Sequence, residues 1–346
     1  MKGEVELIAA LRERLGAAAV PEKGSRLVIG SGDDAAVTEV RGAVATTVDA
    51  VIEGVHFERS TSPLRSVGHK ALAGALSDLA AMGAEPGEAY VQLGLPKGPS
   101  EAECLELADG IADVATDHGL VIAGGDVTRA PVLLLAVTAV GYAPSPEELV
   151  LRSGARPGDV LAVTGELGGA AGGLLVLSRP ELAGAVSEPV ADELRRRQLR
   201  PQPQIEAGRT LARTGAKAMI DLSDGLGGDA RHLAEAGGVG ARIELGSVPL
   251  AAGVEAVAAA AGVERFELAT GGGEDYELLA ALAPDALSSA IGALDAIGVS
   301  LTRVGEVTAG SGVELIDPSG NSRPARGFDQ LAPRQSRSGR GEAGAA

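Results

Sequence analysis

Aspartate recurs beside glycine or a hydroxyl residue where short apolar runs end. The acidic positions that share this local pattern are Asp33, Asp34, Asp49, Asp78, Asp126, Asp221, Asp224, Glu274 and Asp275. A single aspartate after a strand is usually a turn former or a helix N-cap. Strand ends at one edge of a sheet lie close together, so a series of such acidic turns predicts carboxylates that share one cleft.

Carboxylates gathered in a cleft need protons or cations. Two of them about 6 Å apart repel by roughly 3 kcal/mol at an effective dielectric constant near 20. Hard oxygen ligands without His or Cys suit Mg²⁺, which keeps several waters and bridges carboxylates to phosphate oxygens. The neighbouring glycines let backbone N–H groups approach phosphate, and helices expected to begin after Asp78 and Asp224 would add positive dipole ends. The pattern therefore indicates magnesium-bridged polyphosphate chemistry.

The elements that must position these residues follow from hydrophobic periodicity, which alternates β-branched runs with helical segments and predicts an α/β (α+β) fold. We expect helices at 5–15, 67–82, 102–116, 170–177, 203–213, 225–236, 254–261 and 285–297. We expect strands at 27–29, 43–48, 90–95, 120–123, 131–142, 160–164, 218–222, 241–245 and 276–282, and two closing strands. Turn-rich segments at 143–146 and 154–158 predict domains over 1–145 and 146–332, with a disordered tail over 333–346.

Composition excludes several classes of function. The 346 residues carry a net charge of −17 and only 2% aromatic side chains, which argues against a nucleic-acid partner. No apolar run approaches the ~20 residues of a membrane span, and the first residues alternate apolar and charged types unlike a signal peptide. The single cysteine, Cys104, excludes an internal disulfide and predicts a reducing cytoplasm. Walker, HExxH, GxSxG and kinase HRD signatures are absent, and one G-x-G-x-x-G spacing lies in the predicted tail.

An ordered series of motifs resembles the thiamine-monophosphate kinase family, within the superfamily of aminoimidazole-ribonucleotide synthetase. The likeness runs from about residue 5 to about residue 331. The motifs are Gly32-Asp-Asp-Ala35, Thr47-Val-Asp49 with His56, Leu76-Ser-Asp-Leu-Ala-Ala-Met-Gly-Ala-Glu-Pro86, Gly124-Gly-Asp126, Leu151-Arg-Ser-Gly154, Asp221-Leu-Ser-Asp-Gly-Leu226, Gly272-Gly-Glu-Asp-Tyr-Glu-Leu278 and Gly327-Phe-Asp329.

The resemblance implies a two-domain aminoimidazole-ribonucleotide-synthetase-like fold. Its N-terminal domain would bind metal and ATP and would dimerise through strands of a mixed sheet with flanking helices, and its C-terminal domain would be α/β. It also implies a cytoplasmic homodimer that makes thiamine diphosphate from ATP and thiamine monophosphate with several Mg²⁺ ions.

The site residues implied by matching positions fall into three groups. Metal ligands would be Asp34, Thr47, Val48, Asp49, Asp78, Asp126, Asp221 and Asp224. ATP would contact Gly125, Asp126, Arg152 and Ser223, and thiamine monophosphate would contact His56, Glu274 and Phe328. Val48 departs from the Ser or Thr common in the family, so it can offer a metal only its backbone carbonyl. Asp33 is expected beside the ligands rather than among them.

The mechanism expected from these roles is in-line transfer of the ATP γ-phosphoryl group to a phosphate oxygen. Because the acceptor is already anionic, no residue is needed as acid or base, and Asp49 and Asp126 would act through the metal. Plainer interpretations stay open: Arg152 as a surface arginine, His56 as half-buried, Glu274 as a helix cap and Phe328 as a hydrophobic plug. Cys104 is expected to be core.

Two other classes of function remain as alternatives. One is another ATP-using member of the superfamily, above all aminoimidazole-ribonucleotide synthetase. Selenophosphate synthetase would need a reactive Cys or selenocysteine in an N-terminal loop, and the first forty residues contain no Cys. The hydrogenase-maturation protein would need a C-terminal Cys, which this sequence also lacks. The other is a non-catalytic protein whose acidic turns bind divalent cations.

Overall fold

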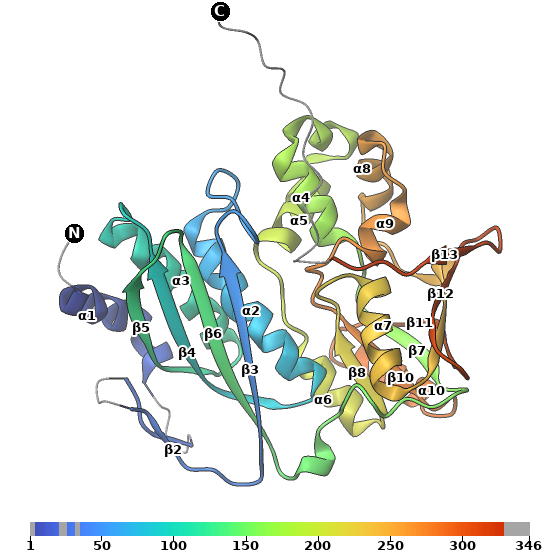
Figure 1. Ribbon diagram of the computed structural model, residues 1–346, viewed down its shortest axis with the longest axis horizontal. Coiled ribbons are helices and arrows are strands. Elements are labelled where there is room, and N and C mark those ends of the chain that lie inside the picture. Colours follow the sequence, from blue (N-terminus) through green and yellow to red (C-terminus); the bar gives the residue numbers. More distant parts are fainter. Residues whose placement is uncertain (1–3, 21–25, 32–34, 329–346) are drawn as a thin grey trace, which may run out of the picture.

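The computed structural model describes residues 4–20, 26–31 and 35–328, which form two halves, each built on its own sheet (Figure 1). The N-terminal sheet has four strands in the order β3-β6-β4-β5. Their bounds are β3 (Ala43–Ile52), β4 (Glu85–Leu95), β5 (Val121–Arg129) and β6 (Leu134–Ala143). β6 pairs antiparallel with β3 and β4, and β4 pairs parallel with β5, so the sheet is mixed as predicted.

One face of this sheet is covered by α2 (Leu64–Ala81) and α3 (Glu101–Asp117), and by the shorter α1 (Glu4–Leu15), which packs on α3. Helix α3 begins with a capping box. The Ser100 hydroxyl accepts a hydrogen bond from the Glu103 backbone N–H, and the Glu103 carboxylate accepts one from the Ser100 backbone N–H. Beside the sheet, β1 (Leu27–Ile29) and β2 (Val37–Thr38) form a small antiparallel pair, and η1 spans Gly16–Ala19.

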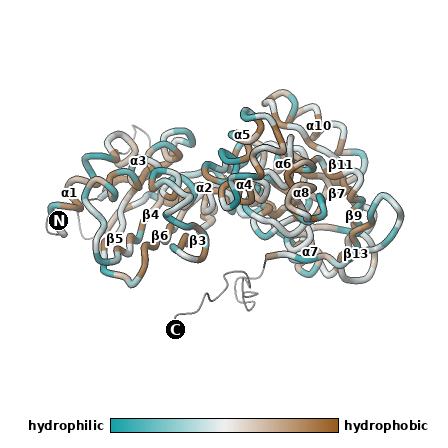
Figure 2. Tube along the Cα trace, turned by 90° about the horizontal axis from the view of Figure 1, so that it is seen from above, coloured by the Kyte–Doolittle hydropathy of each residue, from teal (hydrophilic) through white to brown (hydrophobic). Residues whose placement is uncertain are grey.

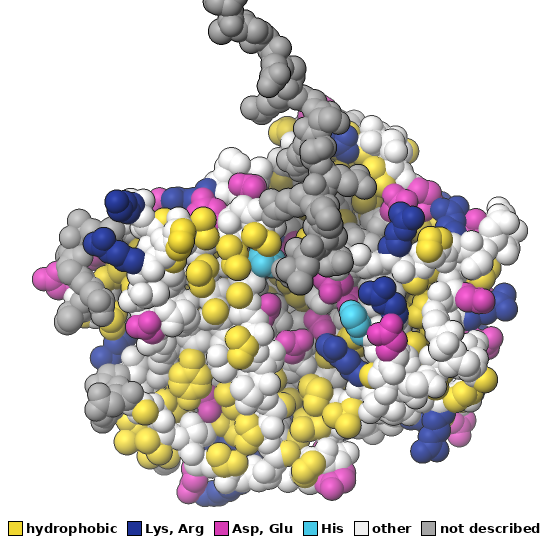
Figure 3. Space-filling view, in the orientation of Figure 1, with side chains coloured by type: hydrophobic (Ala, Val, Ile, Leu, Met, Phe, Trp, Pro, Cys, Tyr) yellow, Lys and Arg dark blue, Asp and Glu magenta, His cyan; other side chains and the backbone are white. Residues whose placement is uncertain are grey.

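Among the residues that the structure describes, no helix covers the opposite face of the sheet (Figure 1). Alternate residues of β3 point to that open side, and Val48 is 69% exposed there. Thr47 and Asp49 therefore point to the helix side, while the Val48 side chain lies on the other face. Figure 3 shows hydrophobic side chains exposed over this half of the molecule.

The C-terminal sheet has seven strands in the order β13-β12-β9-β11-β7-β10-β8, antiparallel except for the β9-β12 pair. They are β7 (Val160–Thr164), β8 (Ala218–Asp221), β9 (Gly240–Glu244), β10 (Leu278–Leu282), β11 (Leu301–Thr308), β12 (Gly312–Ile316) and β13 (Ser322–Pro324). The helices are α4 (Gly169–Ser178), α5 (Glu188–Leu199), α6 (Ile205–Arg213), α7 (Leu226–Gly237), α8 (Val254–Ala261), α9 (Arg265–Thr270) and α10 (Leu287–Asp295). Short 3₁₀ turns are η2 (Pro146–Glu148), η3 (Pro180–Ala185) and η4 (Leu245–Ser247).

Helix α2 lies between the two halves (Figure 2) and is nearly all buried. It packs on β3 and β6 with one side and on α6 and β8 with the other. Small residues allow this double contact: the α6 glycine Gly208 sits directly on the backbone of Ala80. Within the described residues, no helix is both long and apolar enough to cross a membrane.

The predicted α/β class is confirmed, and most predicted elements are present within a few residues. The sequence did not predict helices α5 and α9 or strands β2 and β13. Two expectations about the acidic residues are wrong. Asp49 and Asp126 lie inside β3 and β5 rather than at strand ends, because both strands continue past the polar residues. Asp78 lies in the last turn of α2, so no helix begins after it and the expected positive dipole end is absent there.

Candidate active site

The site is built around the face of α2 that meets β3 and the C-terminal half. Thr47 donates a hydrogen bond to the Asp78 carboxylate, which joins β3 to the end of α2. One turn earlier on α2, Gly74 leaves room for Asp49: a Cβ at Gly74 would lie only 2.6 Å from Asp49 Oδ2 and 3.3 Å from the Tyr276 hydroxyl oxygen. The helix therefore lacks a side chain where a carboxylate and a phenol approach it.

Like charges perturb Asp49. Burial raises the pKa of its carboxyl, and the charges of Asp78 and Glu274 raise it further, while the Ala50 N–H and His56 oppose them. His56 stands in the turn after β3, where its Nδ1 accepts a hydrogen bond of 3.1 Å from the Ile52 N–H. The predicted site residue His56 is thus brought to Asp49.

The C-terminal half contributes Asp221 from the end of β8. Its carboxylate accepts a buried hydrogen bond of 2.9 Å from Ser77 of α2. Burial raises the pKa of Asp221, and the nearby charge of Asp78 raises it further, whereas Arg152 lowers it. Asp78 and Asp221 therefore lie close together where the two halves meet, and Arg152 lies close enough to act on Asp221. Figure 3 shows acidic side chains in the middle of this face, between the two halves.

Two loops of the C-terminal half meet beside Asp221. The backbone N–H groups of Glu274 and Tyr276 each donate 2.9 Å hydrogen bonds, to the carbonyls of Ser223 and Leu222. Glu274 and Tyr276 have φ values of 61° and 51°, a left-handed conformation that costs on the order of 1–3 kcal/mol in a residue other than glycine. Such strain is typical of loops that position functional groups.

The acidic residues of this second loop point in different directions. Asp275 accepts hydrogen bonds from the Gly168 and Ala170 N–H groups at the start of α4, and Glu277 accepts one of 2.6 Å from Thr164. These two carboxylates fix the loop. Glu274 is directed to α2 instead.

The turn after β8 also meets the end of the described chain. The Asp224 N–H donates to Asp229 at 3.0 Å, and the Asp224 carbonyl accepts a 2.9 Å hydrogen bond from the Phe328 N–H. Burial raises the pKa of Asp229 to about 8, aided by the charges of Asp221 and Asp224. The Phe328 ring is 52% exposed, so the structure places it at the site's edge and not as a buried plug.

Asp126 and Gly125 lie elsewhere. Strand register places Asp126 level with Ala50, but three strand spacings away, about 14 Å at the usual interstrand distance. Asp126 is on the open face, where it accepts a 2.9 Å hydrogen bond from Gln92, whereas Asp49 faces α2. The structure thus does not bring Asp126 into the cluster around Asp49 within one chain.

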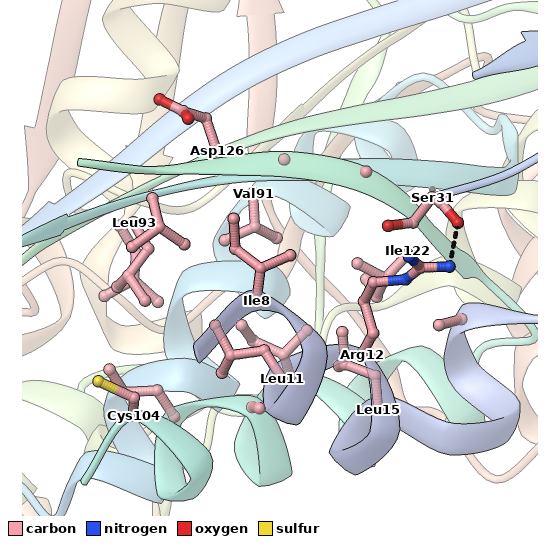
Figure 4. A pocket seen from close by; sticks show the side chains of 18 residues that line it. Ile8, Leu11, Arg12, Leu15, Ser31, Val91, Leu93, Cys104, Ile122 and Asp126 are labelled. Carbon is pink, nitrogen blue, oxygen red and sulfur yellow. Dashed lines mark hydrogen bonds between the residues drawn. The ribbon is translucent and has the colours of Figure 1, made fainter. Parts of the chain in front are cut away.

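An apolar cavity lies on the helix side of β5, enclosed by α1, α3 and the sheet (Figure 4). Ile8 and Leu11 of α1, Val91 of β4 and Cys104 of α3 line it, with Gly125 in its wall. Asp126 points away from it (Figure 4). Cys104 is buried, as predicted for a core residue.

The predicted metal ligands have the chemistry of a magnesium site, since they offer only oxygen, from carboxylates, the Thr47 hydroxyl and the Val48 backbone carbonyl. In the part of the chain that the structure describes, however, no three His, Cys, Asp or Glu side chains stand close enough to hold one ion. Mg²⁺ commonly uses one or two carboxylates and completes its shell with water and phosphate oxygens. The pairs formed by Asp49 with Asp78 and by Asp78 with Asp221 fit that pattern. Asp34 and Asp33 lie outside the described residues.

Three residues of the site were missed by sequence reasoning: Lys70, Gly74 and Tyr276. Gly74 and Lys70 occupy one face of α2 with Asp78, at four-residue spacing, which is the only signal the sequence offered. The partner of Gly74, Asp49, comes from strand β3 about 25 residues earlier in the sequence, and the partner of Lys70, Glu274, comes from a loop 204 residues later.

Comparison with known proteins agrees with the motifs. Models of the AIR synthase related protein match residues 32–143 (N-terminal domain) and 156–318 (C-terminal domain). The thiamine-monophosphate kinase of Escherichia coli (strain K12) is 38% identical over 315 residues, which is 89% of this chain and 91% of that one.

Solved structures extend the likeness to three dimensions. The crystal structure of thiamine-monophosphate kinase from Stenotrophomonas maltophilia K279a is 34% identical, with a TM-score of 0.79 over 92% of this chain and 96% of that one. AaThiL complexed with AMPPCP and TMP is 28% identical, with a TM-score of 0.73 over 94% of this chain and 96% of that one. The resemblance inferred from the motifs is confirmed: the chain belongs to the AIR synthase related family and, within it, to the thiamine-monophosphate kinases.

Proposed function

We propose that this protein transfers the γ-phosphoryl group of ATP to thiamine monophosphate, giving thiamine diphosphate and ADP. The observation that supports this best is the meeting of carboxylates across the two halves. Thr47 with Asp78, and Ser77 with Asp221, join β3, α2 and β8 where the two halves meet. Family membership and the AaThiL complex with AMPPCP and TMP support the choice of substrates.

The acidic cleft favours charge neutralisation over acid–base chemistry. The attacking phosphate oxygen of the acceptor is already anionic, so no residue has to remove a proton from it. We propose that Asp49, Asp78, Asp221 and Asp224 hold Mg²⁺, with Thr47 beside them. When bound, the metal would neutralise and align the phosphates of the two substrates. The protein's part is to fix the carboxylates so that the two phosphates meet in line.

ATP would be held by two regions. Gly125 stays a predicted ATP contact; it packs against the backbone of Val91 in β4 and forms part of the wall of the apolar cavity under β5. Asp126 stays a predicted ATP contact on the open face of the sheet, on the opposite side from that cavity. Arg152 acts electrostatically on Asp221, and Ser223 follows Asp221 by two residues, so both are placed to contact the phosphate chain.

Thiamine monophosphate would occupy the side of the cleft bounded by His56, Glu274 and Phe328. Phe328 offers a half-exposed ring for stacking on a flat heterocycle, and Glu274 offers a carboxylate acceptor.

We also propose that two copies pair through the open face of the N-terminal sheet. Val44 and Val48 are exposed there among small and half-buried side chains, and a two-sided sheet with one uncovered apolar face is typically covered by a partner. A second copy would bury this face and would bring the interface next to Asp126. Cytoplasmic location stays a prediction, consistent with a single buried thiol and no disulfide.

The test is a substrate panel. Purified protein is incubated with Mg-ATP and, separately, thiamine, thiamine monophosphate or formylglycinamidine ribonucleotide. We expect thiamine diphosphate, detected as its fluorescent thiochrome derivative after separation, only from thiamine monophosphate, with one ADP for each product. ADP release only with the ribonucleotide would assign the chain to aminoimidazole-ribonucleotide synthesis instead. Cation binding with no turnover of any of the three would favour a non-catalytic protein.

A further inference from the structure

Lys70 is a buried lysine whose partner comes from the other half of the molecule. It lies in the middle of α2, is only 5% exposed, and its Nζ stands 2.8 Å from Oε2 of Glu274. The side chain of Gln198 on α5 is also buried, and its Nε2 donates to the same oxygen at 2.6 Å. Two donors from two helices therefore converge on one oxygen of one carboxylate.

The second oxygen of Glu274 is left for something else. In the ranges 4–20, 26–31 and 35–328, no hydrogen bond reaches Oε1, and about a quarter of the Glu274 side chain is exposed. The loop conformation at Glu274, with φ of 61°, directs this side chain to the junction between the halves rather than to solvent. A carboxylate held through one oxygen presents the other in a fixed direction.

We propose that Lys70 and Gln198 are positioning residues that clamp Oε2 of Glu274, so that Oε1 accepts a hydrogen bond from an N–H donor on the heterocycle of the phosphate acceptor. This rests on the proposed function and deepens it. The amino group of the aminopyrimidine ring of thiamine monophosphate is a donor of the required kind. The clamp makes recognition of that ring depend on residues that never touch it.

Physical reasons favour this arrangement over a simple ion pair between domains. A lysine this deeply buried is costly unless its ammonium is fully paired, and a pair alone needs only one donor. Gln198 adds a second, neutral donor to the same oxygen and so fixes the carboxylate plane as well as its position. The negative charge of Glu274 also acts on Asp49. The positive charge of Lys70 offsets that of Glu274 and so reduces the repulsion between Glu274 and the proposed metal ligand Asp49.

The experiment compares steady-state constants of Lys70→Met and Gln198→Met with wild type. We expect the KM for thiamine monophosphate to rise about tenfold or more in each, with the KM for ATP nearly unchanged. Lys217→Met is the matched control, because Lys217 also pairs with a buried carboxylate in the C-terminal half, but that carboxylate is Asp159 and not Glu274. The control should lose stability without a change in either KM.

A double-mutant cycle distinguishes positioning from a merely structural role. With Glu274 already changed to Gln, adding Lys70→Met should cost little further, because the carboxylate that it positions is gone. The deamino analogue of thiamine monophosphate, with hydrogen in place of the pyrimidine amino group, should be a poor substrate of the wild type. Lys70→Met should discriminate between the two acceptors less than wild type does.

The outcomes separate the two levels of the proposal. Failure of the wild type to phosphorylate thiamine monophosphate would overturn the proposed function. If the wild type is active, two results would overturn the clamp but not the proposed function. One is an unchanged KM for the acceptor in folded Lys70→Met, and the other is fully additive losses in the double-mutant cycle. If Lys70→Met does not fold, Gln198→Met and its cycle with Glu274→Gln give the same decision, since Gln198 donates to the same oxygen.

Discussion

The approach of Asp49 to Gly74 makes a sharp prediction about one added methyl group. Glycine inside a buried helix costs about 0.5–1 kcal/mol relative to alanine, so Gly74→Ala should favour the helix itself. The new Cβ would lie 2.6 Å from Asp49 Oδ2, whereas ordinary contact begins at 3.4 Å. The carboxylate oxygen must therefore move by about 0.8 Å, and the Tyr276 hydroxyl by about a tenth of an ångström.

That displacement is large for a group that positions phosphates. A shift of about 1 Å in a reacting geometry costs on the order of a hundredfold in rate. We therefore expect Gly74→Ala to lower kcat/KM for thiamine monophosphate about a hundredfold, and to raise the magnesium concentration at half-maximal rate. The melting temperature should change little, because the free energy that alanine adds to the helix offsets the free energy lost when the Asp49 side chain is displaced.

The matched control is Gly292→Ala in α10. Gly292 is also helical, but apart from its chain neighbours and the backbone of its own helix, no atom of the described residues lies within 4 Å of the position its Cβ would take. The same substitution there should leave activity at the wild-type level and raise the free energy of unfolding by about 0.5–1 kcal/mol. Wild-type activity and magnesium dependence in folded Gly74→Ala would refute the idea that the site depends on this close approach.

Three further predictions concern the ligands, the interior and the open face. Asp49→Asn should lower turnover by two or more orders of magnitude at limiting magnesium, with the melting temperature retained. The control Asp192→Asn, on the surface of α5, should leave turnover unchanged. Near-normal turnover in Asp49→Asn would argue against a metal role for Asp49. Burial raises the pKa of Glu277 from its usual 4.5 to about 7. Between these pH values the folded protein keeps Glu277 protonated while the unfolded chain does not, so the free energy of unfolding of the wild type falls as the pH rises from about 4.5 to about 7. Glu277→Gln should remove that decline, gaining up to about 3 kcal/mol over wild type between pH 5 and pH 8 in urea unfolding, and a parallel pH dependence in both proteins would contradict it. Val48→Glu should convert a dimer to a monomer in sedimentation equilibrium, and an unchanged mass would place any interface elsewhere.

Much of the fold could be predicted because local patterns decide it. The 3.6-residue spacing of apolar positions in 67–82 and the β-branched run at 160–164 agree with α2 and β7. Strand lengths were underestimated where glycine and aspartate continue a strand, as in β5. These residue types have a low propensity for strands, but pairing with the neighbouring strand β4 keeps them in the extended conformation. The helix at Glu188–Leu199 was missed because its charged residues leave only a few apolar positions to mark a face.

The site was less accessible to sequence reasoning, for geometric reasons. The acidic motifs identified Asp49, Asp78 and Asp221 as candidates, and the structure brings these three together where the two halves meet. Whether Asp126 joins them depends on which face of a strand it occupies and how many strands intervene, and neither is a local property. The pairing of Lys70 with Glu274 spans 204 residues, so no local pattern announces it.

The placement of α2 would couple substrate recognition to metal binding in the proposed reaction. A single buried helix presents Lys70, Gly74 and Asp78 in successive turns, so it fixes the carboxylate proposed to bind the acceptor, makes room for Asp49, and supplies a candidate metal ligand. Because the helix packs on both halves, any change in their relative position would move all three together. Phosphoryl transfer between two anions requires both phosphates to be aligned within a fraction of an ångström, and one rigid element shared by the two binding regions provides that alignment without a separate hinge.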